Sequence, residues 1–94
     1  MNRRIYIISY DLKNPGRDYA PLYEAIKRCG DWQHPLESTW LVFTVASAGD
    51  IYNAIKPTLD NNDLLFISEL NADNRQGWLA KSCWEWINEC INHV

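Results

Sequence analysis

The chain has 94 residues, a length that suits one domain with a modest core. Hydrophobic residues make up 47% of it and charged residues 22%, and its five Trp and five Tyr supply ample surface to bury, so a disordered chain is excluded. Twelve acidic against nine basic residues give a net charge of -3, which argues against a tight, non-specific nucleic-acid binder.

The three cysteines, Cys29, Cys83 and Cys90, form no CxxC pair and indicate neither a disulfide framework nor a zinc site. The start of the chain, Met-Asn-Arg-Arg before an apolar strand, lacks the pattern of a signal peptide. No apolar run is long enough to cross a bilayer. We therefore expect a cytoplasmic protein with reduced thiols.

The first third of the chain predicts a strand followed by a helix. Residues 5–10 are β-branched or aromatic almost throughout, which is typical of a strand buried on both faces. A turn follows at Asn14-Pro15-Gly16. Apolar residues then recur at helical spacing over residues 19–29, with Asp18 as a suitable N-cap and Gly30 as a C-terminal stop.

The middle of the chain predicts two more strands and a second helix. Residues 31–36 form an irregular segment or a short strand, and residues 38–44 form a strand. Residues 47–50 have the pattern of a capping box, with Asp in place of the usual Glu. The helix that follows over residues 51–59 is shortened or kinked by Pro57.

The last third predicts a strand at residues 64–68 and an amphipathic helix over about residues 77–92. The order strand, helix, strand, strand, helix, strand is the split βαβ, or ferredoxin-like, pattern. We therefore predict a single α+β domain over residues 1–94, with a ferredoxin-like core at residues 4–70 and an extra C-terminal helix. Its helices are expected on one face of an antiparallel sheet.

The C-terminal helix is unusually rich in tryptophan. The helical pattern begins with Trp78, and Trp86 shares a helical face with Leu79 and Cys83, so core packing explains it. Trp84 falls on another side of the helix. We therefore expect Trp84 to contact a second copy or a protein partner.

Asp11 is the main candidate for chemistry. A carboxylate at the end of a central strand opens onto the edge of the sheet, and a two-fold axis would bring a second carboxylate beside it. Such a pair suits Mg²⁺ or Mn²⁺, which could activate a water against a phosphodiester. The alternative is that Asp11 bonds the backbone of the turn at Lys13 and Asn14.

Four further residues are weaker candidates, and each has a structural alternative. Arg17 could hold a phosphate or be a solvated loop charge. His34 could be a general acid or base, or simply an exposed loop residue. Ser38 could orient a water bound to the metal, or start a strand, and Tyr10 could contact substrate.

The chain resembles a known group of proteins in three segments. "YIISYD", which ends at Asp11, resembles the first strand of the small CRISPR-associated spacer-acquisition subunit, and "ESTWLV" resembles a later strand of that family. VapD-type toxin ribonucleases share the architecture. A closer likeness is to short bacterial and phage proteins labelled "SinR family", through "YDL-x-x-PG-x-DY", "STWLV" and "ND-L-L-x-I".

The resemblance implies a homodimer in which two copies of Asp11 share a divalent ion near the two-fold axis, with Ser38 nearby. It implies a nucleic-acid-processing protein, a metal-dependent endoribonuclease, and the acidic charge favours RNA over duplex DNA as substrate. The expected site has Asp11 and Ser38 as catalytic residues, Asp11 as metal ligand, and Tyr10, Arg17 and His34 as substrate contacts.

The departures from the CRISPR-associated family are the acidic charge and the Trp-rich C-terminal helix. These favour an alternative function, a non-catalytic dimeric module. Such a module would bind a protein or a small ligand, in a defence or toxin–antitoxin context, through its sheet and through Trp84.

Overall fold

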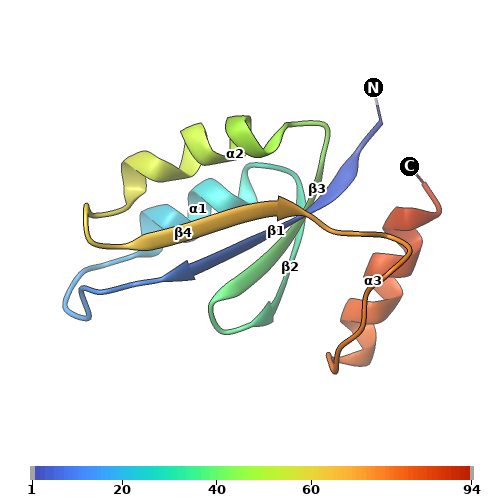
Figure 1. Ribbon diagram of the computed structural model, residues 1–94. Helices are drawn as coiled ribbons and strands as arrows, with labels where there is room; N and C mark the ends of the chain where they lie inside the picture. The colour runs from blue at the N-terminus through green and yellow to red at the C-terminus, as the bar shows by residue number, and fades with distance from the viewer. Residues whose placement is uncertain (1, 94) are drawn as a thin grey trace.

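The computed structural model describes residues 2–93 (Figure 1). Among these residues, no helix has the length and apolar character needed to span a bilayer. The element order confirms the predicted βαββαβ core with an added C-terminal helix. The elements are β1 (Arg4–Asp11), α1 (Ala20–Lys27), β2 (Asp31–Leu36), β3 (Thr39–Thr44), α2 (Ala48–Ile55), the 3₁₀ turn η1 (Lys56–Thr58), β4 (Leu64–Glu69) and α3 (Lys81–Ile91).

The four strands form one sheet in the order β2-β3-β1-β4, and every neighbouring pair is antiparallel. β1 is central, so that Ile8 lies opposite Trp40 of β3 on one side and Ile67 of β4 on the other. Asp11 ends the ladder opposite Leu64. This topology confirms a ferredoxin-like α+β fold.

The helices α1 and α2 cover one face of the sheet, as Figure 1 shows. We call this the helix face. Alternate residues of β1 and β3 point to it, because side chains along a strand alternate between the two faces of a sheet. Its core is fully buried, and the largest side chains in it are Ile8, Leu22, Ile26, Val42, Ile51 and Ile55.

The opposite face is covered by α3, which corrects the prediction that all helices lie on one face. Cys83 and Ile87 of α3 pack against Ile5 of β1 and against Leu41 and Phe43 of β3. Ile5 and Ile7 of β1 are apolar on this face, as are Leu41 and Phe43 of β3, so this part of the face also needs a covering layer. The prediction therefore holds for α1 and α2 and is wrong for α3.

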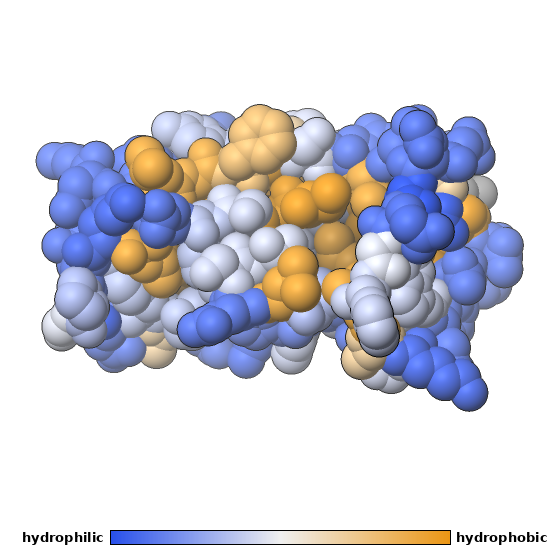
Figure 2. All heavy atoms as spheres, turned by 60° about the horizontal axis from the view of Figure 1, so that its bottom comes forward, coloured by the Kyte–Doolittle hydropathy of each residue, from blue (hydrophilic) through white to orange (hydrophobic). Residues whose placement is uncertain are grey.

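α3 covers only part of that face. The part that it leaves bare, which we call the open face, holds exposed apolar side chains, with Leu36 exposed by 52%, Leu64 by 58% and Phe66 by 68%. Figure 2 looks onto this side and shows hydrophobic patches at the surface away from α3. The residues of the open face are Ser9, Asp11, Leu36, Thr39, Leu64 and Phe66.

The boundaries of α2 follow the local signals that predicted them. The Ser47 side chain accepts from the Asp50 N–H at 3.1 Å, and the Asp50 carboxylate accepts from the Ser47 N–H at 3.1 Å. These reciprocal bonds confirm the capping box. At the other end, the helix stops at Ile55 and continues as a 3₁₀ turn that contains Pro57.

The start of α3 differs from the predicted one. α3 begins at Lys81, and the residues before it form an irregular segment that contains Trp78. Trp78 is 98% exposed, so the pattern that counted it with the apolar side of the helix was wrong. Trp84 and Trp86 are half-buried against the core under α3.

Candidate functional site

Asp11 is the last residue of β1 and lies on the open face. Its carboxylate is 62% exposed, and Lys13 Nζ lies 2.7 Å from Asp11 Oδ2. Ser9, Asp11, Leu64 and Phe66 line one shallow depression of the surface. The carboxylate therefore combines access to solvent with a neighbouring positive charge and an apolar border.

The turn after Asp11 is closed by a residue from elsewhere in the chain. The backbone N–H of Lys13 donates to Asp63 Oδ1 at 2.8 Å, and Asp63 belongs to the loop before β4. The alternative interpretation of the sequence was that Asp11 itself bonds the backbone of this turn. Because Asp63 accepts the bond instead, the Asp11 carboxylate stays available at the surface.

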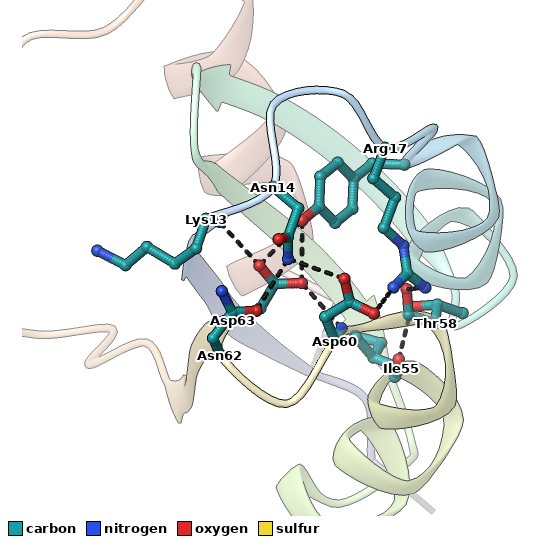
Figure 3. A network of polar contacts seen from close by, with 9 residues as sticks. Lys13, Asn14, Arg17, Ile55, Thr58, Asp60, Asn62 and Asp63 are labelled. Atoms are coloured by element: carbon teal, nitrogen blue, oxygen red, sulfur yellow. Dashed lines mark hydrogen bonds and ion pairs between the residues drawn. The ribbon is translucent and has the colours of Figure 1, made fainter.

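Asp63 is part of a network that joins the loop after β1 to the loop before β4 (Figure 3). The Tyr19 hydroxyl donates to both oxygens of Asp63, at 2.9 and 3.0 Å. Asn14 Nδ2 donates to Asp60 Oδ2 at 2.8 Å, and Arg17 pairs with the other oxygen of Asp60. We call these five residues the loop clamp.

The loop clamp draws three of its five residues, Asn14, Arg17 and Tyr19, from the "YDL-x-x-PG-x-DY" segment, and Tyr19 is the one that the motif itself specifies. It also places Arg17, whose guanidinium donates to the Thr58 carbonyl at 3.0 Å as well as to Asp60. Arg17 therefore connects two loops and does not face the open surface around Asp11. Arg17 was expected to bind a phosphate beside Asp11, but its guanidinium is bonded to Asp60 and Thr58 instead.

Tyr10 points to the helix face, although it is adjacent to Asp11 in the chain. Its ring is 7% exposed, and its hydroxyl accepts from Trp40 Nε1 at 2.9 Å. Burial raises the pKa of Tyr10, and the hydrogen bond from Trp40 offsets part of that rise. The structure places Tyr10 in the core, away from the side where substrate would meet Asp11.

His34 lies in β2 on the helix side of the sheet. Its ring stacks on Trp40 with centroids 3.9 Å apart and an interplanar angle of 12°. His34 Nε2 is 3.1 Å from the Glu37 carbonyl oxygen. Trp32 packs on the same Trp40 at 5.2 Å. His34 is thus exposed and belongs to an aromatic cluster that the sheet separates from Asp11.

Ser38 is the candidate that the structure keeps at the same end of the sheet as Asp11. It lies in the turn between β2 and β3, and its carbonyl oxygen accepts from the backbone N–H of Tyr10 at 3.1 Å. Ser38 and Asp11 therefore lie at the same end of the sheet, although Ser38 pairs with Tyr10 and not with Asp11.

The donor set for a metal ion is incomplete within one chain. In the part of the chain that the structure describes, no group of three or more His, Cys, Asp or Glu side chains could hold a metal ion. Asp60 and Asp63 are already bonded within the loop clamp. On the open face Asp11 is the one acidic residue, and its carboxylate is paired with Lys13, so an ion there needs further ligands from water, nucleic acid or a second copy.

The residues of the clamp that sequence reasoning missed are Asp60 and Asp63. The available signal was two acids in the polar loop before a strand, with Arg17 unpaired in another loop at a helix start. Nothing in the local sequence connects the two loops, because 41 to 50 residues separate the bonded partners.

Comparisons with protein-family models, with curated proteins and with solved structures found no match to this chain. Fold and site together define a small α+β domain with a four-stranded antiparallel sheet and a partly open sheet face.

Proposed function

We propose that the chain is a nucleic-acid-processing protein similar to the small CRISPR-associated spacer-acquisition subunit and to VapD-type ribonucleases. It acts as a homodimer, and Asp11 is its ligand for Mg²⁺ or Mn²⁺. The observation that carries this proposal is the exposed Asp11 carboxylate at the end of the central strand, on the open face.

A second copy supplies what one chain lacks. A two-fold axis near Asp11 brings two carboxylates together, and hard divalent cations favour such oxygen ligands while they keep several waters. The same arrangement buries Leu64 and Phe66, which are mostly exposed in one chain. Burial of apolar area contributes about 25 cal/mol for each Å² removed from water.

The chain's own residues have separate roles in this site. Asp11 orients the ion, and Lys13, whose ammonium lies 2.7 Å from that carboxylate, turns to a phosphate oxygen when the ion is bound. Ser38, at the same end of the sheet, orients a water. The ion, when bound, supplies a water that is a strong nucleophile near neutral pH. The net charge of -3 favours short RNA over long duplex DNA.

A cleavage assay tests this proposal. Labelled single- and double-stranded RNA and DNA are incubated with the protein and Mg²⁺, Mn²⁺ or EDTA. We expect RNA cleavage that requires the metal and is lost in Asp11→Asn, because the amide keeps the shape of the carboxylate and removes its charge. Asp31→Asn is the matched control, since Asp31 also forms an exposed ion pair, with Arg3 at 3.4 Å. Equal cleavage by wild type and Asp11→Asn, or none by either, would contradict the nuclease.

A second candidate is a non-catalytic dimeric module for a protein or small ligand in a defence or toxin–antitoxin context. It is favoured by the engagement of Arg17 in the loop clamp and by the presence of only one carboxylate, that of Asp11, on the open face. This module leaves every nucleic acid intact and is indifferent to Asp11→Asn. Its partner binding falls in Trp84→Ala, because Trp84 is the half-buried aromatic beside the open face.

A further inference from the structure

The open face continues into an apolar groove beside α3. The groove has a volume of about 280 Å³ and lies between the sheet and the segment before α3. Its wall is mostly apolar, and its sheet side carries Leu36 of β2 and Ile7 of β1. Other residues that line it are Thr39, Leu41, Leu70, Trp84 and Ile87.

Trp78 stands at the rim of this groove. Its side chain is 98% exposed, and an indole ring in water leaves a large apolar area unburied. Seven large hydrophobic side chains are exposed among residues 2–93, and four of them lie on the open face or at its groove, namely Leu36, Leu64, Phe66 and Trp78. Such a concentration marks an interaction surface.

We infer that the open face binds a second copy of this chain, with Trp78 of each copy seated in the groove of the other. The inference rests on the proposed homodimer and specifies its interface. A two-fold interface uses the same patch twice, so the patch must be complementary to itself. This surface meets that condition because it carries both a protruding indole and an apolar groove.

The charges on this surface also fit a second copy. Asp11 and Lys13 are adjacent and opposite in sign, so a two-fold axis near them brings two ammonium groups together with the two carboxylates. The four side-chain charges sum to zero before an ion binds, so repulsion between the carboxylates is offset. A membrane surface would require a basic excess that this face lacks.

Sedimentation over a dilution series tests the interface. We expect wild type to dimerise and Trp78→Ala to raise the dimer dissociation constant on the order of 30-fold, as for a central aromatic anchor. Phe66→Ser, at a second position of the same face, weakens the dimer as well. Trp32→Ala is the control, because Trp32 is also an exposed tryptophan, at 40%, and lies on the helix side of the sheet.

The outcomes are separable from those of the cleavage assay. A wild-type protein that stays monomeric, or a dimer that Trp78→Ala and Phe66→Ser leave unchanged, overturns the interface. Equal weakening by Trp32→Ala also overturns it, because the effect would then lie outside the open face. If the protein forms a dimer that depends on Trp78 but cleaves no nucleic acid, the interface is supported and only the proposed nuclease activity is contradicted.

Discussion

The two faces of this sheet differ in how they are covered. On the helix face, α1 and α2 bury Ile8 and Val42 completely. On the opposite face, α3 buries Ile5 and Phe43 but leaves Phe66 68% exposed. The two crossover helices of a ferredoxin-like core fall on one face of the sheet, whereas a single added helix can cover only part of the other. We propose that a partner binds at the bare remainder of this face.

The largest predicted effect is on the helix face. Ile8→Ala removes a side chain with 0% exposure between α1 and α2, and we expect it to lower the free energy of unfolding by about 3 to 4 kcal/mol. Urea unfolding of the purified protein measures this. Phe66→Ala is the comparison on the open face, and at a concentration where the chain is monomeric it should cost less than about 0.5 kcal/mol.

A smaller loss is expected where α3 meets the sheet. Ile87 is 2% exposed in the cluster that joins α3 to β1 and β3. Ile87→Ala should cost about 2 to 3 kcal/mol in the same experiment, because this cluster is smaller and can relax toward solvent. An unchanged stability would mean that α3 does not cover this face, and the contrast between the two faces would fail.

The loop clamp holds the end of β1 that carries Asp11. Asp63→Ala leaves the Lys13 N–H, the Asp60 N–H and the Tyr19 hydroxyl without their acceptor. We expect a loss of about 2 kcal/mol, the usual cost of such unpaired groups when they are partly buried. Asp73→Ala, in the exposed loop before α3, is the control and should cost little.

The last predicted effect is confined to alkaline pH and is absent near neutral pH. Burial, chiefly, raises the pKa of the Cys90 thiol under α3 from 9.0 to about 11. Because the folded-state pKa is the higher one, Cys90 contributes stability below pH 9 that is lost as the pH rises toward 11. Burial also raises the pKa of Tyr10 on the helix face above 10.0, with the same sign.

Unfolding free energies measured between pH 8 and pH 11 check this on both faces. Cys90→Ala should flatten the fall that begins at pH 9, and Tyr10→Phe should flatten the fall that begins near pH 10. If both variants lose stability with rising pH as steeply as wild type, the burial of Cys90 and Tyr10 does not cause the alkaline loss of stability.

The element order could be predicted from the sequence because its signals are local. The capping box at Ser47 and Asp50 and the end of α2 before Pro57 each depend on residues within one helical turn. The near-continuous β-branched and aromatic run of β1 likewise predicts a strand buried on both faces, since it depends only on neighbouring residues.

The features that sequence reasoning missed depend on long-range contacts. Which face α3 covers depends on the path of the loop before it, and that path also leaves Trp78 in water. Arg17 was expected at the site, but Asp60, 43 residues away, holds it in the loop clamp. The geometry of a strand sends Tyr10 and Asp11 to opposite faces, and Ser38, which pairs with Tyr10, shares with Asp11 only the end of the sheet at which it lies.

The most direct test of a metal site shared between two open faces is the stoichiometry of Mn²⁺ binding, measured by calorimetry on wild type and Asp11→Asn. We predict one ion for every two chains, with binding lost in Asp11→Asn and weakened in Trp78→Ala through the loss of the dimer. One ion per chain, or binding that Asp11→Asn leaves unchanged, would contradict a site built from two copies of Asp11.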